Sequence, residues 1–439
     1  MNIFWHRRDL RIDDNAGLYY ALRESDKVQP VFIFDKHILD KLEDKEDARV
    51  EFIHTQVQLL KELYAASGGD LQVHYGYPEK IIPQLIKKYT PEKIYTNRDY
   101  EIYAKERDAK VEEICKKKSV EFKTYKDHVI FEHNEVLKKD GLPYTVFTPY
   151  KRRWLEKLET KSTRGLSYFF KSYPNKKYLD SINQCDKEAL IPLRKMGFAS
   201  TQIPIPDKTV SQGLIKKYEE QRNFPAVNGT SRLGIHLRFG TISIREKARK
   251  AQGLSDTFLS ELVWRDFYSQ ILANFPKVEN SAFRDKYEKI PWRNNEKEFQ
   301  AWCAGKTGYP IVDAGMRELN NTGHMHNRVR MVVASFLTKH LLIDWRWGEA
   351  YFAQKLLDFD LASNNGGWQW AAGCGTDAAP YFRIFNPTSQ QKKFDKDLKY
   401  IKKWVPELDT EDYPAPIVDH KEARERCLKT YKEALNQAL

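Results

Sequence analysis

The segment VQPVFIF (residues 28–34) sets the fold class of the N-terminal part of the chain. It is a short run rich in Val, Ile and Phe, which is typical of a β-strand. Similar runs occur at residues 2–7, 71–76, 93–97 and 120–125. Segments with apolar residues at helical spacing lie among them, at 48–66, 79–89 and 103–118. This alternation predicts an α/β domain with a doubly wound parallel sheet and right-handed crossovers.

The pattern changes twice after about residue 130. Prolines interrupt residues 131–205 repeatedly, which indicates a long connector. Beyond about residue 210 nearly every periodic segment has helical spacing, as in 258–275 and 327–343. We therefore expect an α/β domain at 1–130, a connector at 131–205 and an all-helical domain at 206–439. The dinucleotide fingerprint G-x-G-x-x-G is absent, so nothing in the sequence supports a nicotinamide site.

Composition and charge narrow the class of protein. Of 439 residues, 41% are hydrophobic and 31% charged, as in ordinary globular proteins. No apolar run approaches the roughly 20 residues needed to cross a bilayer. The start, MNIFWHRRDLR, lacks the apolar core of a secretory signal, so we expect a cytoplasmic location. The net charge of +12 favours nucleic acid as the partner, although a solvated lysine-rich surface would explain the charge equally well.

Neither metal nor disulfide chemistry is indicated. The five cysteines lie far apart without a C-x-x-C pair, which argues against a disulfide framework or a zinc ribbon. The two histidines of GHMH (323–326) are two apart, so in a helix they would point to different faces. We expect no metal site.

Several motifs of the helical part place polar and aromatic residues on one helix face. In SELVWRDFY (260–268) the positions i, i+3, i+4 and i+7 are Glu261, Trp264, Arg265 and Tyr268. Asn327, Arg330 and Met331 share a face in the same way, and Asp358 and Asp360 are placed to pair with Arg330. NGTSRLG (228–234) offers hydroxyls and backbone N–H groups that suit a pyrophosphate. Each motif alone also fits an amphipathic surface, but together they predict a cavity for a large planar redox cofactor.

The stretch LASNNGGWQWAAG (361–373) places Trp368 and Trp370 directly behind two glycines and two asparagines. A helix entry with two core tryptophans explains the stretch. Alternatively, Gly366 and Gly367 allow something bulky to approach the backbone closely. The stretch by itself leaves both interpretations open.

Five motifs together resemble the photolyase/cryptochrome family, most closely the class I cyclobutane pyrimidine dimer DNA photolyases. They are FWHRRDLRIDDNAGL (4–18), NGTSRLG, SELVWRDFY, KTGYPIVDAGMRELNNTGHMHNRVRM (306–331) and DLASNNGGWQWAAGCGTDAAPYFRIFNP (360–387). The resemblance covers the chain to about residue 410. It implies flavin adenine dinucleotide (FAD) inside the helical domain, and it allows a second, antenna chromophore at the α/β domain.

The resemblance assigns flavin contacts and an electron relay by matching positions. Asn364 would lie beside the flavin N5, and Trp368, Trp345 and Trp292 would form the relay, with Trp292 nearest the surface. The same matching implies that further residues of this chain contact the cofactor. They are Tyr218, Thr230, Ser231, Arg232, Leu233, Gly234, Phe258, Glu261, Arg265, Asn327, Arg330, Asp358 and Asp360.

The resemblance also implies the substrate: UV-damaged DNA, with the dimer flipped into the cavity. Reduced FAD, excited by blue or near-UV light, would lend an electron that splits the cyclobutane ring, so the enzyme would be a carbon–carbon lyase. Glu261 would hydrogen-bond the dimer, and Trp264 and Trp370 would cradle it. Asn327, Arg328 and Met331 would border the dimer, and Arg222 and Arg328 would meet phosphates. We expect a monomer.

Some positions depart from the family pattern. Gly234 replaces a frequent serine, and Phe258 and His324 replace frequent tryptophans. Residues typical of folate-binding relatives are missing near 103–104 and 278–279, so a deazaflavin, a second flavin, a folate or no antenna stay open. Two other functions also stay open: a cryptochrome-type photoreceptor and a (6-4) photoproduct photolyase. Against the latter, the two positions where such enzymes carry histidines are Asn327 and Met331.

Overall fold

The computed structural model describes residues 1–436 apart from 161 and 164–165, so the last residues of the predicted helical domain and three of the predicted connector lie outside it. Contacts group the chain into two compact units. The first comprises Met1–Val136, Arg153–Thr209 and Leu233–Gln252, and the second comprises Leu137–Arg152, Val210–Arg232 and Gly253–Leu439. Residues of the predicted connector thus contribute to both units. The domain boundaries at 130 and 205 stay a prediction.

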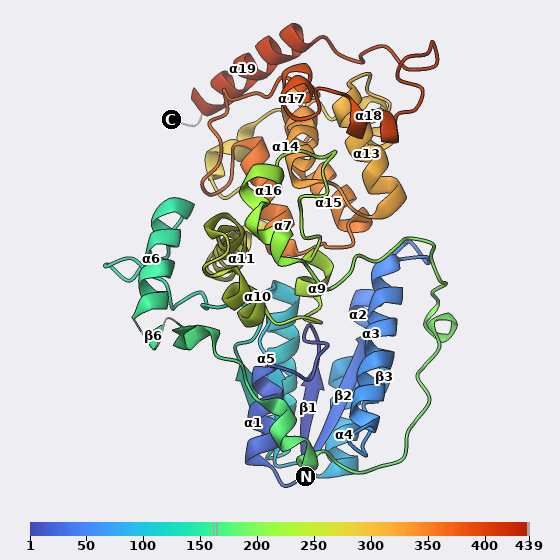
Figure 1. Ribbon diagram of the computed structural model, residues 1–439, viewed down its shortest axis with the longest axis vertical. Helices are drawn as coiled ribbons and strands as arrows, with labels where there is room; N and C mark the ends of the chain where they lie inside the picture. Colours follow the sequence, from blue (N-terminus) through green and yellow to red (C-terminus); the bar gives the residue numbers. More distant parts are fainter. Residues whose placement is uncertain (161, 164–165, 437–439) are drawn as a thin grey trace. The chain divides into compact units, whose positions relative to one another are not determined.

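The first unit contains a five-stranded parallel sheet in the order β3-β2-β1-β4-β5. Figure 1 labels its strands β1, β2 and β3. Every residue of the strand predicted at 28–34 is buried, as expected for a parallel sheet covered on both faces. The strands are β1 (Asn2–His6), β2 (Val28–Asp35), β3 (Gln72–Gly76), β4 (Lys93–Asn97) and β5 (Glu121–Tyr125). The predicted doubly wound sheet is confirmed.

Helices cover both faces of this sheet. One apolar cluster joins strand residues such as Phe4 to Leu18 of α1 and Val57 of α3, and another joins Ile3 to Ile82 of α4 and Val111 of α5. These helices are α1 (Ala16–Glu24), α3 (Ala48–Ala65), α4 (Pro78–Tyr89) and α5 (Ile102–Lys117). The other elements up to residue 251 are α2 (Lys36–Leu39), α6 (Phe147–Glu159), β6 (Ser162–Thr163), β7 (Leu166–Ser167), η1 (Tyr168–Phe170), η2 (Asn175–Ser181), η3 (Leu193–Met196), α7 (Gln212–Lys216), α8 (Tyr218–Gln221), α9 (Gly234–Arg238) and α10 (Ile244–Ala251).

The second unit is helical, as predicted, and its core surrounds Trp302, Val333 and Phe336, which are fully buried. Its remaining elements are α11 (Asp256–Asn274), η4 (Pro276–Glu279), η5 (Asp285–Lys289), α12 (Glu296–Cys303), α13 (Pro310–Thr322), α14 (Asn327–Ser335), η6 (Phe336–His340), α15 (Trp345–Lys355), α16 (Leu361–Ala372), α17 (Pro387–Phe394), α18 (Lys399–Trp404) and α19 (His420–Asn436).

The helix predicted at 327–343 is regular only as far as Ser335. A π-helical turn, Phe336–His340, follows it, with the N–H of Leu341 donating to the carbonyl of Phe336 (3.1 Å). The Thr338 hydroxyl also donates to the carbonyl of Ala334 (2.9 Å), so a side chain competes for this part of the backbone ladder. Sequence periodicity does not reveal this wider turn, because apolar spacing barely changes over five residues.

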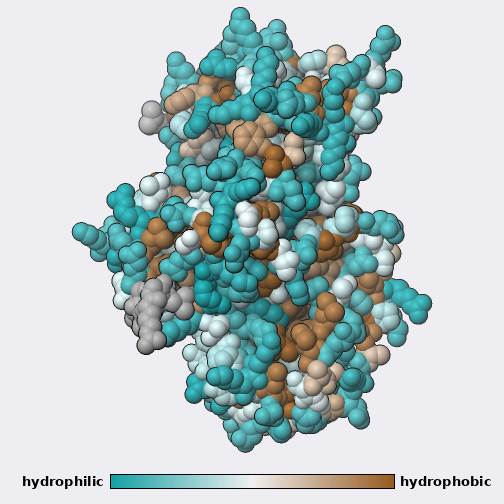
Figure 2. All heavy atoms as spheres, viewed as in Figure 1, coloured by the Kyte–Doolittle hydropathy of each residue, from teal (hydrophilic) through white to brown (hydrophobic). Residues whose placement is uncertain are grey.

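The face in view in Figure 2 is largely hydrophilic. Across the part of the chain that the structure describes, no helix combines the length and hydrophobicity that crossing a bilayer requires.

Candidate active site

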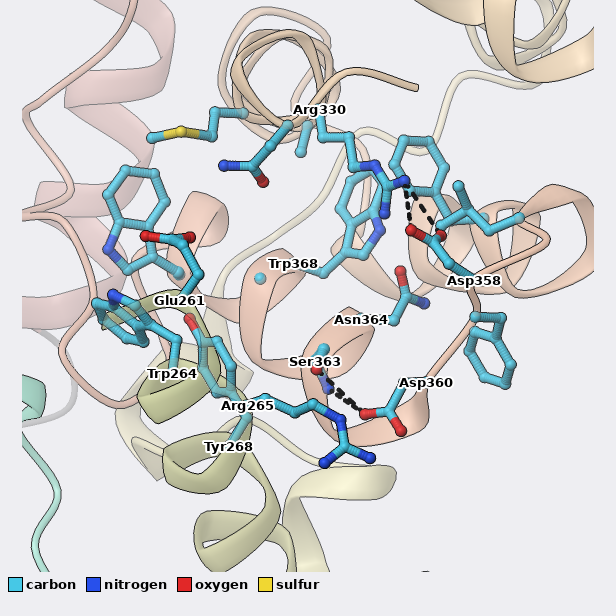
Figure 3. Close-up of a pocket in the computed structure, with 18 of the residues that line it drawn as sticks. Glu261, Trp264, Arg265, Tyr268, Arg330, Asp358, Asp360, Ser363, Asn364 and Trp368 are labelled. Atoms are coloured by element: carbon cyan, nitrogen blue, oxygen red, sulfur yellow. Dashed lines mark hydrogen bonds and ion pairs between the residues drawn. The ribbon is translucent and has the colours of Figure 1, made fainter. Parts of the chain in front are cut away.

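A cavity of about 430 Å³ opens between helices of the second unit, a size typical of small-molecule sites. Four helices, α11, α14, α15 and α16, and the segment between α15 and α16 supply most of its lining (Figure 3). Of the residues predicted for the site, those that line it are Arg222, Glu261, Trp264, Arg265, Asn327, Arg330, Met331, Asp358, Asp360, Asn364, Trp368 and Trp370.

Helix α11 presents the four-residue face that its spacing predicts, because Glu261, Trp264, Arg265 and Tyr268 all line the cavity. The Glu261 carboxylate forms an ion pair with Arg222 from the end of α8. Both side chains are only partly buried, at 31% and 22% exposed, so the carboxylate stays accessible from the cavity. The pair therefore places a charged hydrogen-bonding group at one end of the cavity.

Helix α14 contributes Asn327, Arg330 and Met331. The Arg330 guanidinium donates to both oxygens of Asp358 (3.1 and 3.0 Å) and to the carbonyl of Met325 (2.7 Å). Figure 3 shows this pair on the side of the cavity away from Glu261 and Trp264. The predicted pairing of Arg330 with Asp358 is thus present, whereas Asp360 has a different role.

Asp360 is the N-cap of α16 and accepts from the backbone N–H and the hydroxyl of Ser363 (3.2 and 3.1 Å). One turn later, the Asn364 amide donates to the backbone carbonyl and the carboxylate of Glu349 (3.1 and 2.8 Å). Burial raises the pKa of Glu349, although the bond from Asn364 opposes the shift. Glu349 thereby holds the Asn364 NH₂ group, and Oδ1 is left as the acceptor that the side chain can offer to a ligand.

The two glycines before Trp368 have different roles, which corrects the interpretation that both admit a bulky group. A side chain at Gly366 would meet the ring of Tyr268, so this glycine allows α16 to pack against α11. A side chain at Gly367 would meet nothing within 4 Å, and Gly367 lines the cavity. Only Gly367 leaves room for a ligand.

Trp368 is both a core residue and a residue of the cavity wall, so both interpretations of the stretch 361–373 hold for it. It lines the cavity, yet it is 2% exposed and packs edge-on against Phe352 (5.0 Å between centroids) and Trp302 (6.1 Å). Its ring occupies the space that a side chain at Gly348 of α15 would fill. Trp370, two positions on, lines the cavity and is only partly buried.

Other predicted site residues do not line this cavity. Tyr218 packs edge-on against Phe258 (5.1 Å), and burial raises its pKa to about 12. Arg328 donates to Asn223 (2.8 Å), and Trp345 lies in the core at 2% exposed. Leu233 and Gly234 belong to the first unit. The remaining ones that do not line it are Thr230, Ser231, Arg232 and Trp292.

The sequence motifs did not indicate two functional candidates, Glu349 and Ser363. Ser363 and Gly367 line the cavity, and Glu349 orients Asn364. The sequence indicated Gly367 together with Gly366, and only the structure separates the two. Ser363 lies three positions after Asp360, a spacing typical of an N-cap interaction, so that signal was present. Nothing local in the sequence marks Glu349, because its partner lies on another helix.

Family comparisons agree with this geometry. Residues 2–166 match the family model for DNA photolyase, and residues 258–410 match the FAD binding domain of DNA photolyase. The chain belongs to the DNA photolyase family. Members of this family act on DNA, and the cavity lies within the part that matches the FAD-binding domain, apart from Arg222.

Relatives and solved structures cover almost the whole chain. A deoxyribodipyrimidine photo-lyase from Synechococcus sp. is 38% identical over 100% of this chain and 97% of its own length. A bacterial class III photolyase from Agrobacterium tumefaciens has a TM-score of 0.85 at 33% identity, covering 99% of this chain and 97% of that one. An archaeal photolyase from Sulfolobus tokodaii, reported with two FAD molecules, has a TM-score of 0.83 at 36% identity, covering 99% and 100%.

The lining residues fit a flavin. The Asn364 oxygen supplies a hydrogen-bond acceptor, and the Arg330–Asp358 pair supplies donors and acceptors at one side. Gly367 leaves open space where any other residue would place a Cβ. The aromatic rings of Trp368 and Phe352 form an apolar part of the cavity wall. Such a mixture of apolar surface with a few fixed polar groups is what a large planar cofactor requires.

Proposed function

We propose that this protein is a deoxyribodipyrimidine photo-lyase that repairs cyclobutane pyrimidine dimers in DNA under blue or near-UV light. The observation that carries the proposal is that one cavity joins the two predicted sets of residues. Glu261, Trp264 and Trp370 are expected to contact the lesion, whereas Arg330, Asp358 and Asn364 are expected to contact FAD, and all line the same space. Electron transfer between two groups requires this proximity.

FAD, when bound in its reduced form, supplies the light absorption and the electron. The protein's part is to hold and orient. Asn364, fixed by Glu349, would present its carbonyl oxygen to the flavin, and a neutral amide there imposes no charge. The Arg330–Asp358 pair would bind polar atoms of the cofactor while neutralising each other's charge. Trp368, which is almost fully shielded from water, forms part of the cavity wall.

On the substrate side, the dimer would leave the duplex and enter the cavity beside Trp264 and Trp370. Base flipping by photolyases is a known behaviour of the class, and aromatic rings replace the stacking that a flipped base loses. Glu261, held as a carboxylate by Arg222, would accept hydrogen bonds at the base edges. Asn327 and Met331 would border the lesion.

The residues that would border the lesion also indicate which type of lesion the protein repairs. Repair of a (6-4) photoproduct needs proton transfer, which an imidazole supplies near neutral pH. An amide and a thioether occupy the two relevant positions, Asn327 and Met331, and both line the cavity. His326 does not line it: the side chain is 4% exposed and accepts from the backbone N–H of Arg328 (3.2 Å). Splitting a cyclobutane ring needs no net proton transfer.

The deciding experiment incubates the reduced, FAD-loaded protein with each purified lesion under blue light and separates the products by chromatography. We expect conversion of thymine cyclobutane dimers and no change in (6-4) photoproducts. Conversion of the (6-4) product would make the protein a (6-4) photolyase. Light-dependent flavin chemistry without conversion of either lesion would favour a cryptochrome-type photoreceptor.

The proposal also includes a monomer in the cytoplasm with access to DNA, and an antenna chromophore of open identity. The Sulfolobus tokodaii photolyase, described with two FAD molecules and a novel light-harvesting cofactor, supports a second flavin among the alternatives. A visible spectrum before and after heat release of the chromophores identifies any antenna. Light scattering coupled to size-exclusion chromatography tests the monomer.

A further inference from the structure

A second cavity, of about 290 Å³, lies in the same helical unit and shares no lining residue with the first. The loop 225–228, Arg232, Glu318 of α13 and residues of α18 line it. The residues of α18 are Lys399, Tyr400, Lys403 and Trp404. None of these positions is assigned to catalysis, and only Arg232 was expected to contact the flavin. The cavity therefore needs an explanation of its own.

The charge of this cavity is strongly positive. Arg232, Lys399 and Lys403 line it, all three are exposed, and in the described part of the chain none forms an ion pair with a carboxylate. The neighbouring Lys402, by contrast, pairs with Asp409 (2.7 Å) and does not line the cavity. Lys399 and Lys403 are four positions apart on α18 and so share a face. Unpaired cations that converge on a hollow favour an anionic ligand.

Glu318 is the one acidic residue among the described lining residues, against the three cations. Glu318 is 5% exposed, and its carboxylate accepts from the Tyr400 hydroxyl (2.7 Å) and the backbone N–H of His326 (3.1 Å). Both bonds go to Oε2, and Oε1 lies 3.5 Å from Nδ1 of His324, so both oxygens of this carboxylate face groups of the protein. Trp404, partly buried, adds an aromatic surface, and the Lys403 ammonium lies 4.7 Å from its ring centroid. Cations beside an indole are the combination that binds a phosphate and the base next to it.

The backbone on both sides of the cavity is unusual. Arg232 has φ +50°, and Leu398, directly before Lys399, has φ +57°. Residues with a side chain rarely adopt this left-handed region, and such residues gather at ligand clamps.

The two cavities are joined by one short loop. Arg222 lines the first cavity and Pro225 lines the second, so their Cα atoms are at most about 11 Å apart. Between them, Asn223 accepts from Arg328, whose guanidinium lies 4.4 Å from the ring centroid of Phe394. Each DNA strand carries a phosphate about every 3.4 Å along the helix axis. A strand with its dimer in the first cavity would thus reach the second within a few nucleotides.

We propose that this second cavity binds a backbone phosphate of the damaged strand on one side of the dimer, with Trp404 against the adjoining base. This inference rests on the proposed repair function. Arg232, Lys399 and Lys403 would neutralise the phosphate, and the loop 225–228 would follow the strand from the lesion. The site extends recognition beyond the dimer itself and binds DNA without reading its sequence.

The test compares the FAD-loaded double variant Lys399→Ala/Lys403→Ala with a control, Lys396→Ala/Lys402→Ala, which removes two lysines that do not line the cavity. Two substrates are used: a thymine dimer within a 15-nucleotide strand, and the isolated dimer dinucleotide. We expect the double variant to bind the long substrate about tenfold more weakly. The slope of log affinity against log salt should fall by roughly 0.7, the value for one phosphate contact on a single strand. Binding and repair of the dinucleotide, and all values for the control, should match the wild type.

Strands extended only 5′ or only 3′ of the dimer sharpen the test. The double variant, and separately Trp404→Ala, should weaken binding to one of the two and leave the other unchanged. Equal loss on both, unchanged binding of the 15-nucleotide strand, or loss with the dinucleotide would overturn the proposal. The proposal would also fail if the cavity bound adenosine monophosphate or inorganic phosphate and the double variant lost that binding while keeping the wild-type affinity for DNA. If the wild type repairs neither substrate, it is the repair function that fails.

Discussion

Phe147 stacks face to face on Trp264, with ring centroids 3.5 Å apart and planes 6° from parallel. Phe147 opens α6 and is 7% exposed, whereas Trp264 lines the cavity. One face of the indole is therefore covered by protein. Phe267 meets the indole edge-on (5.6 Å), which fixes its tilt. The ring expected to stack on the lesion is thus held before any substrate arrives.

Replacing Phe147 with Leu should weaken binding of dimer-containing DNA about two- to tenfold. The reason is that a stacked aromatic pair contributes about 0.5–1.5 kcal/mol beyond its buried area, and its loss frees the indole to rotate. Gel-shift titration of damaged and undamaged duplexes measures the effect, which should be confined to the damaged one. Phe382→Leu, at a side chain 62% exposed, is the control. Equal affinity of Phe147→Leu and wild type for the dimer would remove Phe147 from lesion binding.

Alanine substitutions at the two adjacent glycines should have opposite consequences. Gly366→Ala should lower the free energy of unfolding by about 1–3 kcal/mol, because its methyl group meets the Tyr268 ring. Gly367→Ala should leave the unfolding free energy unchanged or raise it by up to about 1 kcal/mol, since alanine favours a helix. It should, however, lower FAD content by narrowing the cavity. Urea unfolding of the flavin-free proteins and flavin-to-protein absorbance ratios measure the two effects. Full FAD content in Gly367→Ala would show that this wall does not face the cofactor.

Trp292→Phe should abolish light-driven reduction of oxidised FAD and spare repair by protein whose FAD was reduced chemically beforehand. Trp292 is partly exposed and packs edge-on against Tyr431 (6.0 Å), which suits the solvent end of a relay. Repair itself involves only the cofactor and the lesion. Absorbance at flavin wavelengths during illumination with an external reductant follows the first reaction. Photoreduction at the wild-type rate would exclude Trp292 from the relay, which stays a prediction.

Acid should destabilise the protein through buried histidines. Burial lowers the pKa of His326 to about 4 and that of His340 to about 3, and His420 and Arg426 also oppose a charge on His340. Because an unfolded histidine titrates near 6.5, the unfolded chain binds more protons below that pH. Their contribution to stability is complete above about pH 6.5 and is lost progressively toward pH 4 and 3. The slope is about 1.4 kcal/mol per pH unit for each group.

Carboxylates titrate in part of the same range, so the comparison with a variant is decisive. His340 hydrogen-bonds His420 (2.8 Å), and His340→Gln keeps a polar side chain without the titration. Its unfolding free energy, from urea titrations between pH 6.5 and 4.5, should depend less steeply on pH than that of the wild type. Identical slopes would show that His340 is not held neutral.

The sequence by itself determined the features that depend on local periodicity. VQPVFIF predicted the buried β2, and the spacing of SELVWRDFY predicted the face of α11 that lines the cavity. Side chains at i, i+3 and i+4 share a face of any α-helix, whatever packs against it. Resemblance of longer motifs added the family and its cofactor, because those motifs combine residue types that no periodicity requires.

Only the tertiary structure decided which faces meet and which partner each polar group takes. Glu261 pairs with Arg222, 39 positions away, although helical spacing indicates only Arg265, one turn along its own helix. Asn364 is oriented by Glu349 of α15, and Gly366 is required by Tyr268 of α11 and not by a ligand. Such partners are selected by the packing of one helix against another. That packing depends on the shapes of many side chains at once, and no single stretch of sequence carries it.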